Sequence, residues 1–209
     1  MNAGKNNSVP RWLKFIAVAS LAGTVLFPQS ARNAVTAQSS DQSQSSAPKH
    51  APHVTVAKIA PRAEDVSTVD GIIKAYYDVI SGPSGQPRQW ARDATLYIPN
   101  VRFILMSERP GGKITANSMT HQEFVDTADA SLGGKAFYEH EIHRITHRAG
   151  NIVHVFSTSA HSSSADGPVE GQSVDSLELF NDGTRWWIAG ANIWELDGKN
   201  HPLPAEFLP

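Results

Sequence analysis

The stretch from Glu139 to Ala160, EHEIHRITHRAGNIVHVFSTSA, decides the fold. Its two halves alternate with a period of two residues around the tight turn Arg148-Ala149-Gly150-Asn151, which is the pattern of a β-hairpin. Two more strands follow, with the tight turn Asn181-Asp182-Gly183-Thr184 between them. The four predicted strands span 139–147, 152–160, 173–180 and 186–195. The sequence therefore predicts an antiparallel meander in the C-terminal half of the chain.

Two segments before the meander have helical spacing instead. Ser67-Thr68-Val69-Asp70 has the pattern of a capping box, and apolar residues then recur at helical spacing up to Gly82, which predicts a helix over 67–81. A second capping box, Thr120-His121-Gln122-Glu123, begins a helix that Gly133-Gly134 ends. A small strand pair is predicted between the helices, at 95–98 and 102–106, and its second strand turns at Arg109-Pro110-Gly111-Gly112 into 113–117. Because a meander needs a helical cover on one face, the fold class is α+β.

The N-terminus has the features of a secretory signal peptide. A basic region ends at Lys14, an apolar run spans 15–27, and Val35-Thr36-Ala37 is a small-residue cleavage pattern, so the predicted signal is 1–37. Thirteen helical residues extend about 20 Å, short of the ~30 Å hydrocarbon core of a bilayer. We therefore expect a periplasmic or secreted protein with no stable membrane span after cleavage; the alternative is an uncleaved membrane anchor.

Composition divides the rest of the chain. Residues 38–63 are rich in Ser, Gln and Pro and are predicted to be a disordered linker, because such a segment buries too little apolar surface to fold. The folded domain is expected over 64–197, followed by a C-terminal tail over 198–209. With 209 residues, 40% of them hydrophobic, the chain is long enough for one domain with a sizeable core.

Charge and cysteine content exclude several functions. The chain has no cysteine, which rules out disulfides, thiolate metal sites and a cysteine nucleophile. Beyond residue 37 there are 14 basic and 20 acidic residues, so a nucleic-acid partner is not expected. No cofactor fingerprint is present, and no cofactor is predicted.

The order of elements and several phrases resemble the nuclear transport factor 2-like superfamily, in its SnoaL-like bacterial branch. The resemblance covers roughly 64–197. The phrases that carry it are Tyr76-Tyr77-Asp78-Val79-Ile80-Ser81-Gly82-Pro83, Phe137-Tyr138-Glu139, 150–158 and 182–188. It implies a cone: a strongly bent antiparallel sheet wrapped around N-terminal helices, with a pocket at the open end and frequent homodimerisation through the outer sheet face. The chain departs from the superfamily in its second helix, which has room only for Gln89–Asp93.

Ketosteroid isomerase is the enzyme of this superfamily whose chemistry is best defined, and it uses a carboxylate base with a tyrosine and a protonated carboxylic acid as donors. By this resemblance Tyr76 falls near the place of the tyrosine. Ile98 stands where the base is expected, however, and Ser176 where the second acid is expected. The resemblance therefore does not imply that mechanism for this chain.

Six residues are candidates for a ligand-binding pocket. His154 lies on the strand face that carries Phe156, and its imidazole can exchange a proton near neutral pH. Glu178 shares a face with Ser176, although the pattern does not tell which face of the sheet lines the pocket. The expected ligand-binding set is Tyr76, His154, Ser176, Glu178, Asn192 and Trp194. The candidate catalytic residues are His154, Tyr76 and Glu178, each of which also has a credible packing role.

Strand alternation places His143 and His147 on one face together with Glu141, which makes a surface metal site geometrically possible. Polar residues of this kind are also ordinary on a half-buried strand, and no metal is predicted. The last strand has large apolar residues on both faces, which predicts a homodimer. The function favoured by these observations is a non-catalytic domain with an apolar pocket for a small organic ligand; the alternative is a cofactor-independent isomerase, dehydratase or hydrolase.

Overall fold

The computed structural model describes residues 52–109, 111–190, 192–196 and 202–209, with the backbone alone for 192–196. The predicted signal peptide, 1–37, and most of the predicted linker lie outside the described residues. No helix within the described part of the chain is long and apolar enough to cross a membrane.

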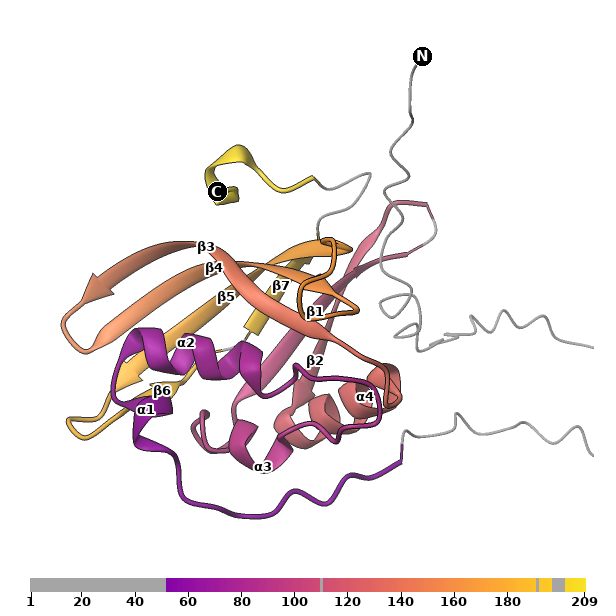
Figure 1. Ribbon diagram of the computed structural model, residues 1–209. Coiled ribbons are helices and arrows are strands. Elements are labelled where there is room, and N and C mark those ends of the chain that lie inside the picture. The colour runs from indigo at the N-terminus through magenta and orange to yellow at the C-terminus, as the bar shows by residue number, and fades with distance from the viewer. Residues whose placement is uncertain (1–51, 110, 191, 197–201) are drawn as a thin grey trace, which may run out of the picture.

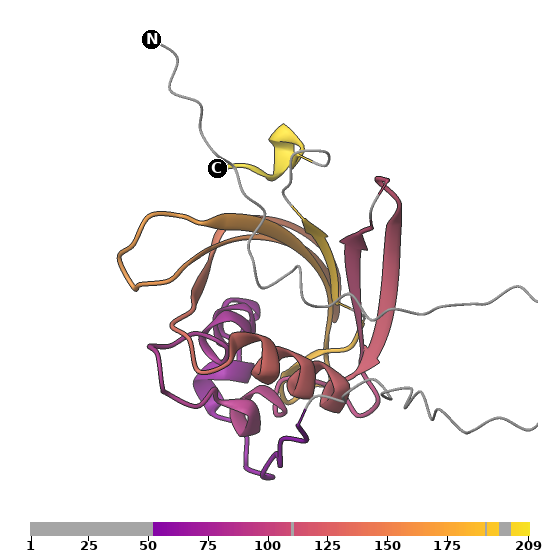
Figure 2. The same ribbon diagram turned by 90° about the vertical axis from the view of Figure 1, so that its right-hand side faces the viewer.

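The predicted α+β class is confirmed. The strands form one sheet in the order β2-β1-β7-β5-β4-β3, with β6 beside β5, and all neighbours are antiparallel except β1 and β7. The strands are β1 (Arg102–Glu108), β2 (Ile114–Thr120), β3 (Tyr138–Ala149), β4 (Ile152–Ser162), β5 (Gly171–Asn181), β6 (Trp186–Ile188) and β7 (Asn192–Leu196). The sheet bends strongly around the helices (Figures 1 and 2). We call the side that faces the helices the concave face and the other side the convex face.

The helices are α1 (Ala63–Val66), α2 (Val69–Asp78), α3 (Trp90–Asp93) and α4 (His121–Leu132), with a 3₁₀ turn, η2, at Ala205–Phe207. The α4 prediction is confirmed in detail: Thr120 and Glu123 form the capping box, and Gly133 ends the helix in the left-handed region at φ 52°. Helix α2 is shorter than the predicted 67–81. Its N-cap is Thr68, whose hydroxyl oxygen accepts a hydrogen bond from the amide of Gly71, so Ser67 remains outside.

The core lies between α2 and the concave face. Apolar side chains of α2 and of the odd-numbered positions of β4 and β5 are fully or almost fully buried there: Ile72, Ile73, Val153, Val155, Leu177 and Leu179. The odd-numbered residues of these two strands therefore face the helices, and the even-numbered residues face outward.

Two predicted strands are wrong. Residues 95–98 form only an isolated bridge, from Tyr97 to Ile188, whereas β1 pairs with β2, the segment into which it was predicted to turn. The predicted strand 186–195 is two strands, because the amides of Ala189 and Gly190 both donate to the carbonyl of Glu178, at 2.7 and 3.2 Å. This doubled contact interrupts the ladder on β5 and lets β7 run between β5 and β1.

Gly190 is required at this interruption. A Cβ added there would lie 2.3 Å from the Cβ and 2.5 Å from the Cγ of Glu178. We expect Gly190→Ala to lower the free energy of unfolding by about 1–3 kcal/mol, the usual cost of overpacking. Urea denaturation measures the change. The matched control is Gly85→Ala, whose added Cβ meets nothing within 4 Å and which is strained only by its positive φ. Equal stability of Gly190→Ala and the wild type would contradict the assignment.

Both ends of the domain extend further than predicted. The amide of Val54 donates to Asp126 on α4 at 2.8 Å, and Val54 and Val56 pack against the core. The linker predicted to reach residue 63 therefore ends before Val54. At the other end, the carbonyl of Phe207 accepts a hydrogen bond from Thr158 at 2.7 Å, and the Phe207 ring packs on Phe156. The segment 202–209, part of the predicted tail, thus covers the convex face over β3 and β4 (Figures 1 and 2).

Candidate functional site

A β-bulge in β3 decides which of its polar side chains face the helices. The register shifts between Glu141, opposite Ser159, and His143, opposite Thr158, so Ile142 is the extra residue. Glu141 and Arg144 therefore both face the concave side, whereas His143 faces the convex side. The predicted grouping of Glu141 with His143 and His147 is wrong, because simple alternation does not continue through the bulge. Among the described residues there is no group of three or more His, Asp or Glu side chains that could hold a metal ion.

Asp175 is the central polar residue of the concave face. It is only 2% exposed, between the core residues of β5 and helix α2. The hydroxyl group of Tyr77 lies 3.2 Å from its Oδ2 and 2.8 Å from the Oγ of Ser157. Its Oδ1 has no hydrogen-bond partner within the described part of the chain. A buried carboxyl oxygen without a partner is costly, so this atom is an exception among the buried polar groups.

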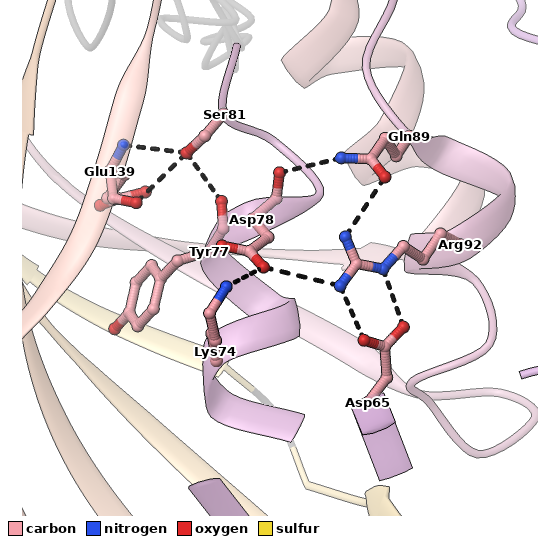
Figure 3. Close-up of polar contacts among 8 residues, drawn as sticks. All are labelled: Asp65, Lys74, Tyr77, Asp78, Ser81, Gln89, Arg92 and Glu139. Atoms are coloured by element: carbon pink, nitrogen blue, oxygen red, sulfur yellow. Dashed lines mark hydrogen bonds and ion pairs between the residues drawn. The ribbon is translucent and has the colours of Figure 1, made fainter. Parts of the chain in front are cut away.

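Glu139 is the second acid on this face. Ser159 donates to its Oε1 at 2.7 Å, and Ser159 in turn lies 3.0 Å from Ser173. The backbone of Glu139 is held to the end of α2, because its amide donates to the hydroxyl of Ser81 at 2.9 Å (Figure 3). Unlike Asp175, Glu139 and Ser173 are only partly buried. We call Tyr77, Glu139, Ser157, Ser159 and Asp175 the acid cluster.

Burial controls the protonation of the two acids. It raises the pKa of Glu139 to about 7, against the opposing effect of the hydrogen bond from Ser159. Burial and the nearby Glu139 carboxylate raise the pKa of Asp175 well above its ordinary value, although the hydrogen bonds of Tyr77 and Tyr76 act in the other direction. Because two like charges in one site repel, each acid also helps to hold the pKa of the other above its ordinary value.

An ion pair connects the acid cluster to the protein surface. Arg144 donates to both carboxylate oxygens of Glu141, at 2.8 and 2.6 Å, and to Asp70 at 2.5 Å. The hydroxyl of Ser157 donates to Glu141 Oε1 at 2.5 Å. The guanidinium of Arg144 therefore holds both oxygens of Glu141 in place, and Glu141 fixes the orientation of the Ser157 hydroxyl.

A second ion pair holds α2 in place from its other side. Figure 3 shows Tyr77 directed toward the sheet, while the side chain of Arg92 lies on the opposite side of α2 and joins Asp65, Asp78 and Gln89. Arg92 donates to both oxygens of Asp65, at 2.8 and 2.7 Å. Because this pair fixes α1 and α3 against α2, it sets the position from which Tyr77 reaches Asp175.

The predicted catalytic set is not assembled. Nε2 of His154 lies 2.9 Å from Ser176 Oγ and 3.9 Å from Glu178 Oε1, so these three residues do meet. They meet on the convex face, however, where His154 packs on Phe156 beneath the C-terminal segment. Tyr76 is buried in the core on the concave side, in contact with Tyr77. The sheet therefore separates Tyr76 from the other two, and the expected convergence of His154, Tyr76 and Glu178 is wrong.

Asn192 and Trp194 are described only by their backbone. In the register of β7, Trp194 is opposite Asp175 on β5 and Asn192 is beside Phe103 on β1. Their expected roles as ligand contacts therefore concern the strand that lies next to the acid cluster, and they stay predictions.

Sequence reasoning missed Asp175, although a signal for it was present. Asp175 stands on the same strand face as Leu177 and Leu179, and an acid in an otherwise apolar face is an informative exception. The resemblance placed the expected second acid at Ser176, one residue away and on the opposite face. The structure thus supplies a buried acid at the neighbouring position, beside the tyrosines of α2.

These observations define the class: an α+β protein in which a bent antiparallel sheet wraps around N-terminal helices and holds one buried and one partly buried acid on its concave face. No family model matches the chain, and no curated protein matches it. Among solved structures, it is similar to a protein of unknown function with a cystatin-like fold from Nostoc punctiforme, at 9% identity and a TM-score of 0.46 over 64% of this chain and 96% of that one. It is also similar to a protein of unknown function from Mycobacterium tuberculosis, at 14% identity and a TM-score of 0.46 over 66% and 80% of the two chains.

Proposed function

We propose that the domain binds a small organic molecule at the concave face, with the acid cluster as its polar anchor and the surrounding aliphatic side chains as its apolar wall. Membership of the nuclear transport factor 2-like superfamily is part of this proposal. The observation that carries it is the unpartnered Oδ1 of Asp175, a buried polar atom next to the hydrophobic core. Few, well-oriented polar groups in an apolar surround are typical of sites for small molecules. Binding without chemical conversion is the primary function proposed.

A second candidate, a cofactor-independent isomerase, dehydratase or hydrolase, has one observation in its favour. Burial raises the pKa of Glu139 to about 7, and the pKa of the neighbouring Asp175 is raised well above its ordinary value. A pair of carboxyl groups whose pKa values are separated by their environment can divide the roles of general base and general acid. Exchange of ligand C–H groups in D₂O distinguishes the two functions: an enzyme that abstracts protons catalyses exchange that Glu139→Gln stops, whereas a binding module leaves the ligand unlabelled.

A thermal-shift screen of small organic compounds tests ligand binding, because a ligand that binds only the folded state raises the Tm. We expect compounds that stabilise the wild type to have no effect on Asp175→Leu, which removes the polar anchor and keeps a similar volume. His154→Ala is the matched control on the convex face and is expected to respond like the wild type. Loss of the response in His154→Ala alone would move the site to the convex face and contradict the proposal.

Export and homodimerisation are proposed as the setting of this function. The basic and apolar N-terminal segments and the Val35-Thr36-Ala37 pattern support export, with a mature chain that begins at Gln38. Mass spectrometry of the protein from the producing cell checks this, and a chain that still carries the apolar run, found in the membrane fraction, would contradict it.

The proposed homodimer uses the convex face, on which Ile152 remains exposed beside the area covered by the C-terminal segment. Light scattering at micromolar concentration is expected to give the mass of two chains. The mass of one chain would contradict dimerisation without affecting the ligand site.

A further inference from the structure

We propose that the ligand donates a hydrogen bond to Asp175 Oδ1 through a neutral hydroxyl or N–H group. The inference rests on the proposed function and specifies the chemistry of its ligand. It follows from the directions in which the hydrogen bonds of the acid cluster can run, traced inward from the surface.

The donor and acceptor roles in this hydrogen-bond network can be assigned starting from Arg144. A guanidinium has only donors, so both oxygens of Glu141 accept hydrogen bonds from Arg144. The single proton of the Ser157 hydroxyl therefore points to Glu141 Oε1, 2.5 Å away. Ser157 is left as an acceptor toward Tyr77.

The next link is Tyr77. Its one hydroxyl proton goes to Ser157 at 2.8 Å, which leaves the Tyr77 oxygen as an acceptor toward Asp175. A contact of 3.2 Å between that oxygen and Asp175 Oδ2 is a hydrogen bond only if Asp175 carries the proton on Oδ2. Burial and Glu139 raise the pKa of Asp175, which favours this assignment, and the hydrogen bonds of Tyr77 and Tyr76 to the same carboxyl group act in the other direction. Oδ1 is then the carbonyl oxygen of a neutral carboxylic acid, and it can only accept.

The other buried aspartates among the described residues, in contrast to Asp175, have hydrogen-bond partners for both carboxyl oxygens. Asp65 has both oxygens bonded to Arg92. Asp93 accepts from Tyr97 through Oδ1 at 3.1 Å and pairs with His121 through Oδ2 at 2.7 Å. Asp175 is equally buried but has one oxygen without a partner in the described residues. Ser173 and Glu139, on the same face, are partly exposed.

The donor assignment excludes two ligand chemistries. A ketone or ether oxygen offers only an acceptor to Oδ1, so two acceptors would face each other. An ammonium group would be favoured only by an ionised Asp175. The matched probes are therefore cyclohexanol, cyclohexanone and cyclohexylamine, which is cationic at neutral pH.

Ligand-detected NMR at neutral pH with the three probes tests the inference. Wild type is expected to bind cyclohexanol about tenfold more tightly than cyclohexanone, the effect of one hydrogen bond to a buried acceptor. Asp175→Asn keeps this preference, because its amide nitrogen replaces the carboxyl O–H toward Tyr77 and its oxygen remains an acceptor. Asp175→Leu removes the preference. Circular dichroism of each variant verifies that it is folded.

Tyr77→Phe provides a second variant that does not change Asp175. Without the tyrosine oxygen, the Asp175 proton is free to bond a ligand acceptor, so cyclohexanone binding is expected to improve relative to cyclohexanol. Equal binding of the alcohol and the ketone by the wild type, with no change in Tyr77→Phe, would overturn the donor assignment while the ligand site stands. Preferred binding of cyclohexylamine that Asp175→Asn abolishes would also overturn it. Failure of all three probes, together with an unsuccessful thermal-shift screen, would overturn the proposed function itself.

Discussion

Replacing Arg92 by methionine is expected to lower the free energy of unfolding by about 3–5 kcal/mol, because it leaves a carboxylate buried without its counter-charge. The side chains of Arg92 and Asp65 are 11% and 3% exposed, and the guanidinium bonds both oxygens of Asp65. Methionine replaces the apolar methylene groups of the arginine side chain. The expected loss of stability therefore comes from the missing charge rather than from lost packing. Urea unfolding followed by circular dichroism measures the change.

Two controls separate charge from packing in this prediction. The double variant Asp65→Leu with Arg92→Met removes both charges and is expected to recover most of the loss, because an apolar pair of similar volume is often as stable as a buried ion pair. Lys74→Met breaks the ion pair between Lys74 and Asp78, in which the lysine side chain is 74% exposed. This variant is expected to lower the free energy of unfolding by less than about 1 kcal/mol, which is usual for surface ion pairs. A double variant no more stable than Arg92→Met would contradict this account of α2 and its neighbours.

Replacing Glu139 by glutamine is expected to reduce the pH dependence of stability between about pH 4.5 and 7. The pKa of Glu139 is raised from 4.5 to about 7, mainly by burial, so the folded state binds this proton more tightly than the unfolded state. The stabilisation is therefore complete below pH 4.5 and is lost as pH rises to 7, at about 1.4 kcal/mol for each pH unit and about 3 kcal/mol in total. Between about pH 4.5 and 7, the free energy of unfolding of the wild type is therefore expected to fall by more than that of Glu139→Gln.

Chemical denaturation at intervals from pH 4 to 8 provides the two curves, and their difference is the quantity predicted. Asp175 contributes a change of the same sign, so the variant keeps part of the slope. Glu178→Gln is the matched control: it removes a carboxyl from the convex face, where Glu178 is exposed, and is expected to follow the wild type. Parallel curves for wild type and Glu139→Gln would contradict the burial of a neutral acid at this position.

The period of the sequence predicted most of the fold, since residues that alternate every two positions must form strands with one buried face. The hairpin of β3 and β4 and the capping box of α4 are local patterns, and the structure has both. The strand predicted at 186–195 was wrong, because its interruption depends on a contact between Gly190 and Glu178 that is distant in sequence.

The candidate site was harder to predict, because alternation separates two faces without telling which one is concave. His154 was the predicted catalytic candidate on its strand, but it lies on the convex face, whereas Ser157 of the acid cluster lies on the concave face. The bulge at Ile142 shifts the alternation of β3 by one residue. Which face Glu141 and Arg144 share therefore depends on the pairing of β3 with β4 rather than on the local sequence. The raised pKa of Asp175 is caused by burial and by Glu139, which come together only in the folded chain.

The claim that the concave face buries an acid pair in two protonation states is tested most directly by a ¹³C NMR titration of the side-chain carboxyl groups, assigned with Glu139→Gln and Asp175→Asn. We expect the Glu139 resonance to titrate near pH 7 and the Asp175 resonance to remain that of a neutral acid through neutral pH. Titration of both groups near pH 4, at the ordinary values for glutamate and aspartate, would contradict the account.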